Sequence, residues 1–519
     1  MKQNGFALVS VIIAFIIISL MGAFLTNLIS RGSFKAQQKM KNVKAIYASH
    51  AVAETVLKKK IFGSYSTLFD NCRVNSTYLN ITSNVYGLSI TSNCENVSYK
   101  KYMKLNLYGQ VMTRVGSFIK SNTTGNQIVT GIGFQPKALI FYWTRQTATG
   151  FSADVNAGFG LATYYNNSVQ QSAVSVTMRN NANKSDQGRR FSVSNCIIFL
   201  DRGGPPTLRA RAEFVSFNSD GFTINWLTNV TDSYIVNYIA IGGDIIARAG
   251  NFNLTTATGT QTVTGVGFQP DFVLFNWSHA GSFDTNIARS SFGIGYAKSA
   301  SEQGALTQAG SDNEGNNDDK RWQQRTNSCI LILTTANPPA QDAIVAFDTF
   351  NTNGFSINKT DPPSTTIPIF YLAIKGGTHK VGFFNQPNTN ISQTISGVGF
   401  KSKLLKFISF NLLANPNILS NGGVSIGSAT SVNQTSIWYQ DRANEDERSD
   451  ANMYYSNNRT LTLAFSTSLT GQANLTGIFD DQFVLNWTNC DGTQRQIIYW
   501  AMGDSLTPSF KIIEEYELF

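Results

Sequence analysis

The hydrophobic pattern of the first 61 residues is that of one long helix. Residues 6–29 form a run of 24 without a charged side chain, which is enough to span a bilayer as a helix. Apolar residues then recur at helical spacing as far as Leu57, with lysines between them. No proline interrupts residues 6–61, and Gly63 follows them. We therefore predict a helix over residues 6–61, roughly 80 Å long.

Beyond residue 115 the pattern changes to short apolar or alternating runs bounded by Gly, Asn, Asp and Pro, which is typical of β-strands. One stretch, TGIGFQPKALIFYW (130–143), returns as TGVGFQPDFVLFNW (264–277) and as SGVGFKSKLLKFISF (396–410). Other matched strings follow in the same order, such as AGFGLA, SFGIGYA and GGVSIGSA. The starting positions give periods of 134 and 132 residues. Such regular self-similarity indicates three copies of one module.

Each module has room for roughly six to nine short strands and contains no convincing helix. We therefore predict three antiparallel β-sandwiches of jelly-roll type. The first, second and third modules are assigned to residues 115–244, 247–377 and 379–504. Residues 62–112 are predicted to form a small globular segment, and residues 505–519 a C-terminal tail. The predicted fold class is mainly β with one long N-terminal α-helix.

The net charge of +9 is concentrated near the N-terminus. Residues 1–120 hold 15 Lys and Arg against three Asp and Glu, whereas the remainder holds 26 against 29. The modules are thus close to neutral, which argues against nucleic acid as their partner. With 42% hydrophobic residues, 14% charged residues and 519 residues in all, the chain is expected to fold into several globular domains.

The chain begins with a short polar leader ending in glycine, KQNG, followed by an aromatic residue and an apolar run, FALVSVIIAF. This combination resembles the N-terminus of type IV prepilins and type II secretion pseudopilins. The resemblance implies that residues 1–5 are a leader, and that a prepilin peptidase cleaves after Gly5 and methylates Phe6. It also implies an inner-membrane precursor whose helix later joins other pilin or pseudopilin subunits in an extracellular filament or at the cell surface.

One position departs from the family pattern. The family usually has a glutamate four residues after the first mature residue, and this chain has Ser10 there. Such a buried carboxylate needs a charged partner, which in the family is the N-terminus of a neighbouring subunit. A subunit with no neighbour ahead does not need it, and three large modules would crowd a filament shaft. We therefore predict that Ser10 marks a subunit at the filament tip.

Two cysteines are close in a polar segment of the predicted globular region. Cys72 and Cys94 suit a disulfide in an exported protein. By contrast, Cys196 and Cys329 lie at matching positions of the apolar strings SNCIIFL and NSCILIL. We interpret this second pair as buried apolar residues of two modules rather than as bonded partners.

The sequence offers no grouping that indicates catalysis. With three histidines and no Ser-His-Asp arrangement or repeated acid pair, we predict no enzyme activity, no cofactor and no metal site. Two acidic loops, 311–321 and 441–450, are interpreted as solvated, although their oxygen atoms suit calcium. Trp322 and Trp438 lie beside variable polar loops and are candidates for stacking on sugar rings.

These features favour a structural and adhesive protein. It would be a large minor pilin or pseudopilin, at the filament tip, displaying β-sandwich modules that bind a surface glycan or another cell-surface ligand. The alternative is a membrane-anchored surface protein whose β domains bind or act on carbohydrate. A pair of acidic residues in a concave site of one module only would favour the alternative.

Overall fold

The computed structural model describes residues 34–59, 64–69, 71–82, 85–94, 97–279, 281–315, 319–411, 417–442, 448–505 and 509–518. The chain divides into two compact units. The N-terminal unit comprises Met1–Tyr108 together with Pro508–Phe519, and the repeat unit comprises Gly109–Thr507. The predicted processing and assembly residues Gly5, Phe6 and Ser10 lie outside the described residues.

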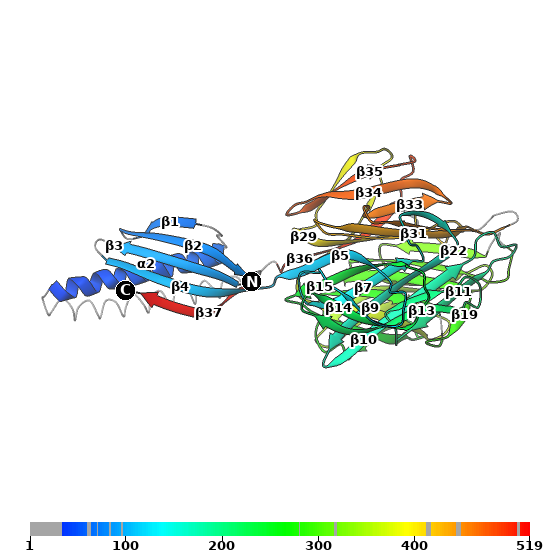
Figure 1. The fold of residues 1–519 in the computed structure, drawn as a ribbon, viewed down its shortest axis with the longest axis horizontal. Coiled ribbons are helices and arrows are strands. Elements are labelled where there is room, and N and C mark those ends of the chain that lie inside the picture. The colour runs from blue at the N-terminus through cyan, green and yellow to red at the C-terminus, as the bar shows by residue number, and fades with distance from the viewer. Residues whose placement is uncertain are drawn as a thin grey trace. The chain divides into compact units, whose positions relative to one another are not determined.

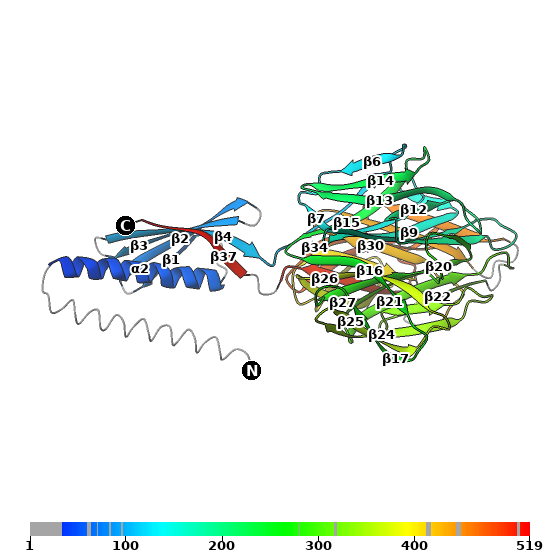
Figure 2. The ribbon, with the colours of Figure 1, turned by 90° about the horizontal axis from the view of Figure 1, so that it is seen from below.

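In the N-terminal unit, helix α2 (Phe34–Lys59) lies along one face of a five-stranded antiparallel sheet (Figures 1 and 2). The strand order is β1-β2-β3-β4-β37, with bounds Ser64–Phe69, Cys72–Thr82, Val85–Cys94, Val97–Tyr108 and Ser509–Leu518. Ala45, Ala48 and Val52 are buried at helical spacing, so they form the stripe that meets the sheet. Leu88 and Ile90 alternate with less buried neighbours in β3 and face that stripe.

The C-terminal segment is a strand of this sheet and not the predicted tail. β37 pairs with β4 from Ser509 opposite Tyr108 to Leu518 opposite Lys100. No local pattern indicates this pairing, because the two strands are separated in the chain by the whole repeat unit. The repeat unit is therefore an insertion between two neighbouring strands of the N-terminal unit.

The long helix predicted over residues 6–61 is described only over Phe34–Lys59. Its apolar first half lies outside the described residues. Among the residues that the structure describes, no helix combines the length and the apolar character required to cross a membrane.

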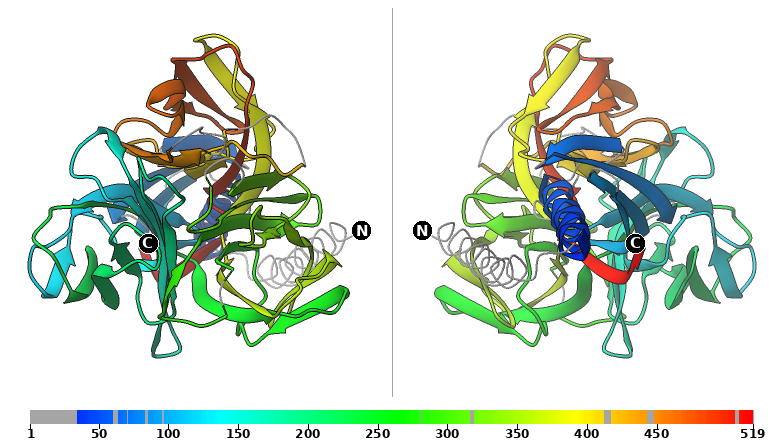
Figure 3. Two further views of the ribbon diagram at one scale, coloured as in Figure 1. Left: turned by 90° about the vertical axis from the view of Figure 1, so that its right-hand side faces the viewer. Right: turned by 90° about the vertical axis from the view of Figure 1, so that its left-hand side faces the viewer.

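The repeat unit contains three two-layered sandwiches, each with an inner sheet and a four-stranded outer sheet (Figure 3). In the first module the inner sheet is β11-β10-β9-β7-β15-β5, with bounds Gln187–Ser192, Ser168–Met178, Val155–Tyr165, Pro136–Thr144, Ile235–Gly243 and Val111–Ile119. Its outer sheet is β12-β13-β14-β6, with bounds Ile197–Leu200, Leu208–Asn218, Gly221–Thr228 and Gly125–Val129.

The other two modules repeat this strand order. The second has β22-β21-β20-β18-β26-β16 (Lys320–Arg325, Glu302–Gly310, Ser290–Ser299, Phe272–Trp277, Ile367–Lys375, Ile246–Leu254) and β23-β24-β25-β17 (Ile330–Leu333, Gln341–Asn351, Gly354–Asp361, Gly259–Thr264). The third has β32-β31-β30-β29-β36-β27 (Asp450–Ser456, Gln434–Arg442, Val424–Ala429, Ser402–Ser409, Gln496–Gly503, Thr378–Asn385) and β33-β34-β35-β28 (Leu461–Phe465, Ser468–Ile478, Gln482–Thr488, Ser392–Ser396). Consecutive strands stay in one sheet, as β9, β10 and β11 do, so the jelly-roll detail of the prediction is not confirmed.

Each inner sheet is buried on both faces. In β7, Leu139, Phe141 and Trp143 point into the core between the two sheets of the first module. The alternate residues Ile140 and Tyr142 belong to a fourth core, which the inner sheets of all three modules share. Burial on both faces explains why PKALIFYWT is an almost continuous apolar run instead of an alternating one.

Short arms link the modules in a closed cycle. The segment after β7 of the first module contains β8 (Gly150–Ala153), which pairs with β32 of the third module. The segment after β18 of the second contains β19 (Asn286–Ala288), which pairs with β11 of the first. In the third module Leu419 forms the equivalent bridge to Trp322 in β22 of the second. Each module thus extends the inner sheet of a neighbour, which gives the repeat unit an approximate threefold arrangement.

Candidate functional site

A groove runs along β5, the edge strand of the first module, where the third module faces it. It consists of three successive cavities with volumes of about 690, 480 and 360 Å³. The first and second share Arg114 and Val432, and the second and third share Ser117 and Asn457. Nine residues of extended strand measure roughly 30 Å, so the groove is long enough for an extended ligand.

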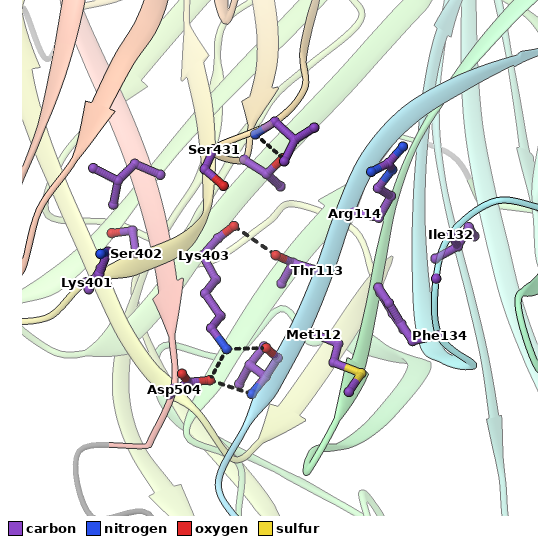
Figure 4. Close-up of a pocket in the computed structure, with 15 residues that line it drawn as sticks. Met112, Thr113, Arg114, Ile132, Phe134, Lys401, Ser402, Lys403, Ser431 and Asp504 are labelled. Carbon is purple, nitrogen blue, oxygen red and sulfur yellow. Dashed lines mark hydrogen bonds and ion pairs between the residues drawn. The ribbon is translucent and has the colours of Figure 1, made fainter. Parts of the chain in front are cut away.

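The first cavity combines apolar side chains with charged ones (Figure 4). Ile132 and Phe134 of the first module lie on one side of it, and Lys401 to Lys403 of the third lie on the other. The Lys403 ammonium is 2.7 Å from Asp504 and also donates to the Val111 carbonyl. Asp504 accepts a hydrogen bond from the Val111 amide. This pair fixes the start of β5 against the third module.

The second and third cavities are lined mainly by hydroxyl and amide side chains, together with Tyr238, Phe118 and Tyr455. Their polar lining comprises Ser117, Thr130, Thr147, Thr149, Asn433, Gln434, Thr435, Asn457 and Asn458. Asp504 is the one carboxylate among the described residues that line the three cavities. The pair of acids that would favour a glycoside hydrolase is therefore not found in this lining.

The open edge of β5 is closed by a side chain of the third module. Asn433, in the hairpin between β30 and β31, donates its amide to the Val115 carbonyl at 3.0 Å. The same position is capped at the other two interfaces, since Thr163 accepts from the Ala249 amide and Glu302 accepts from the Val381 amide. Unpaired backbone N–H and C=O groups of an edge strand can pair with a further strand. Each of these side-chain hydrogen bonds blocks that pairing at one position of its edge strand.

Arg114 lies in the middle of the groove. Strand register makes it equivalent to Arg248 and Lys380, because each pairs with an alanine at the same position of the neighbouring strand. Among the described residues Arg114 takes part in no ion pair, and its buried Nε, like that of Arg248, has no hydrogen-bond acceptor. Burial raises the pKa of Tyr238, and the positive charge of Arg114 and its side-chain hydrogen bond to Tyr238 oppose that rise.

Each of the two equivalent cations has a partner from the neighbouring module, and Arg248 has a second partner, Gly265, in its own module. Lys380 is 3.5 Å from the Glu302 carboxylate. Arg248 donates to the Gly265 carbonyl and lies 5.4 Å from the centroid of the Tyr165 ring. The groove between the first and third modules thus differs from the other two interfaces in the neighbours of its central cation.

The two tryptophans predicted to stack on sugars are buried. Trp322 is 1% exposed and Trp438 is 0% exposed. The arm of the third module bridges to Trp322 through Leu419, and Phe151 of the first module packs edge-on against Trp438. Neither indole offers a face to a ligand, contrary to the prediction. The polar loops beside them in sequence do not surround them, because other modules supply the covering residues.

The structure joins Cys72 and Cys94 in a disulfide, with their Cα atoms 4.2 Å apart. The two residues are directly opposite each other in the pairing of β2 with β3. Cys196 and Cys329 are buried as free thiols in equivalent outer strand regions. Burial raises the pKa of both thiols, so neither is a reactive thiolate near neutral pH.

The two acidic loops meet at their ends. Lys320 is buried and lies 3.1 Å from Asp319 and 3.3 Å from Asp441. Burial raises the pKa of Asp441 to about 7, and the nearby Lys320 opposes that rise. These residues form a buried ionic cluster between the second and third modules, in place of the solvated surface that was predicted for them. In the part of the chain described, no cluster of three His, Cys, Asp or Glu side chains is placed to hold a metal ion.

Sequence reasoning missed the groove because its two walls come from modules about 290 residues apart, as the bond from Thr113 to Lys403 shows. One signal was available. The third module has Lys401 where the first and second have Gln135 and Gln269 in the GFQP string. That difference adds a cation to the first cavity.

Comparison with models of protein families and comparison with curated protein sequences find no match to this chain. A functional assignment therefore depends on the residues and geometry described above.

Proposed function

We propose that this protein is a large minor pilin or pseudopilin that lies at a filament tip and displays the repeat unit for adhesion to a surface carbohydrate. Helix α2 would be the last part of a helix that begins at Phe6. The leader-like KQNG, the apolar run after it and the Ser10 substitution support the filament role. The groove along β5 supports a binding role, because it is lined by hydroxyls, amides and apolar side chains.

The observation that carries this proposal is the position in the chain at which the repeat unit is inserted, between two paired strands of the N-terminal unit. Tyr108 at the end of β4 is directly opposite Ser509 at the start of β37. The helix-and-sheet unit is therefore complete without the inserted residues 109–507. This arrangement suits a carrier that joins an assembly through one unit and presents the other for binding.

Excision of the repeat unit tests the proposal. Because Tyr108 and Ser509 are paired across antiparallel strands, a two-residue Asn-Gly turn can replace residues 109–508, which are the repeat unit and Pro508. We expect the excised protein to be processed to Phe6 and recovered in sheared filaments, while adhesion of the cells to a glycan-coated surface is lost. Mass spectrometry of the N-terminus and a tag on the excised protein report the first two results. An excised protein that still supports adhesion, or mature protein that keeps Met1, would contradict the proposal.

A further inference from the structure

We infer that the groove along β5 binds an acidic oligosaccharide, with Arg114 as the residue that receives a carboxylate of the sugar chain. This inference depends on the proposed adhesive function and names the ligand class of the same site. It is drawn from three observations: the neighbours of Arg114, the second cation in the groove and the chemistry of the lining.

The first observation is a comparison of the module interfaces. Gln170, Glu302 and Asn433 are equivalent, because each precedes a glutamine that accepts a hydrogen bond from a backbone amide in the outer sheet of its own module. The three donors are Phe214, Phe347 and Leu475. At the interface of the second and third modules, Glu302 pairs with the cation Lys380.

At the groove, the equivalent residue Asn433 is neutral and caps Val115. Arg114 occupies the position of Lys380, so the cation lies beside an amide here and beside a carboxylate at the interface of the second and third modules. At the interface of the first and second modules the equivalent residue is the neutral Gln170, and there Arg248 is bonded to the Gly265 carbonyl and lies over the Tyr165 ring. A ligand carboxylate could therefore form with Arg114 the kind of ion pair that Glu302 forms with Lys380. Guanidinium and carboxylate groups match in shape and can form two parallel hydrogen bonds.

The second observation is the sign of the remaining charge. Lys403 and Asp504 neutralise each other at 2.7 Å. Arg114 and Lys401 both line the first cavity, and neither is ion-paired to a described residue. Lys401 is also the position at which the third module departs from the glutamine of the other two. The groove therefore carries a net positive charge, which favours an anionic ligand.

The third observation, the chemistry of the groove lining, favours a sugar chain over a peptide strand as the ligand. A peptide that extended the sheet would need the free backbone groups of β5. The Val115 carbonyl already accepts from Asn433, and the amide and carbonyl of Val111 are bonded to Asp504 and Lys403. Hydroxyl and amide side chains beside Ile132, Phe134 and Tyr238 instead suit the alternating polar edges and apolar faces of sugar rings.

The test uses the full-length chain in detergent and two matched probes. One probe is tetragalacturonate, which has four carboxylates, and the other is the same oligosaccharide with its carboxylates reduced to alcohols. Calorimetric titration should show that the acidic probe binds at least tenfold more tightly, and that added salt weakens its binding. Equal affinity for both probes would overturn the inference while leaving carbohydrate adhesion intact.

Three variants assign the effect to the groove. Arg114→Gln should weaken binding of the acidic probe tenfold or more, since a hydrogen bond to a charged group is lost. Arg248→Gln removes the equivalent cation at another interface and should leave affinity unchanged. Asn433→Glu copies Glu302 into the groove and should also weaken binding tenfold or more, because its carboxylate competes for Arg114.

Tryptophan fluorescence during denaturation shows whether each variant is folded, because all seven tryptophans are buried in the repeat unit. Wild-type affinity in folded Arg114→Gln, or an equal loss in Arg248→Gln, would overturn the assignment to Arg114. If neither probe binds, the inference fails. If the chain then also binds no neutral glycan and no cell surface, the proposed adhesive function fails with it.

Discussion

Replacing Lys406 by leucine is predicted to stabilise the repeat unit. Lys406 is 0% exposed in the shared core, and its ammonium has no hydrogen-bond acceptor in the part of the chain that the structure describes. Its nitrogen lies 4.6 Å from the centroid of the Tyr142 ring and 5.1 Å from that of Phe159. Strand register makes Lys406 equivalent to Ile140 and Leu274. Lys406→Leu thus gives the third module the apolar residue that the other two already have.

The size of the effect follows from the pKa. Burial lowers the pKa of Lys406 from 10.5 to about 7, a difference that corresponds to about 5 kcal/mol. Below pH 7 the amine is charged in both the folded and the unfolded state, so the free energy of unfolding is lowered by this full amount. Between pH 7 and 10.5 the unfolded chain binds more protons, so the stability of the wild type rises with pH. Contacts between the ammonium and the two rings offset about 1–2 kcal/mol of the cost.

Denaturant titrations followed by tryptophan fluorescence measure this directly. At pH 7 we expect Lys406→Leu to unfold with a free energy about 3 kcal/mol above that of the wild type. The difference should shrink by about 2 kcal/mol by pH 9, because the buried lysine of the folded wild type is then neutral while the lysine of the unfolded chain keeps its proton. Lys137→Leu, at an exposed position of β7, serves as the control and should keep the pH dependence of the wild type. A less stable Lys406→Leu variant, or a difference that does not vary with pH, would refute the reasoning.

Three further predictions concern stability. Lys320→Met leaves Asp319 and Asp441 buried without their cation and should lower the free energy of unfolding by about 3–5 kcal/mol at pH 8. The loss should be smaller at pH 5, because burial raises the pKa of Asp441 to about 7 and this carboxylate then takes up a proton; an equal loss at both pH values would argue against this. Gly295→Ala should lower the free energy of unfolding by about 1–3 kcal/mol in the same titration, because its methyl group would overlap the Cys329 carbonyl. Gly281→Ala places its methyl group in open space and should leave that free energy unchanged. The double substitution Cys72→Ser and Cys94→Ser removes a disulfide that joins positions 22 residues apart and should destabilise the N-terminal unit by about 2–4 kcal/mol. Limited proteolysis should then cut within residues 64–108, and unchanged resistance to the protease would contradict the prediction.

Local patterns predicted the β-rich modules, while the contacts between modules depended on partners far away in the chain. The strings around Gly160, Gly295 and Gly427 repeat because a side chain there would overlap a carbonyl of the outer layer of the same module. Such constraints lie within one module and are visible in a self-comparison. The arm β8 pairs with a strand about 300 residues later, and β37 pairs with β4 across the whole repeat unit. Neither pairing leaves a local pattern.

The same limit applies to the candidate site. Trp322 and Trp438 were chosen from their polar sequence neighbours, but Leu419 and Phe151 of other modules cover them. Arg114 was not chosen, because a single arginine in a strand carries no signal. Its position becomes informative only when the third module places Asn433 beside β5.

The central claim is that the N-terminal unit anchors this protein at the tip of a filament and the repeat unit is displayed there. Immunogold labelling of sheared filaments, with antibodies against the repeat unit, tests this claim most directly. We predict label at one end of each filament and none along the shaft. Label spaced regularly along the shaft, or absent from filaments and confined to the membrane fraction, would contradict it.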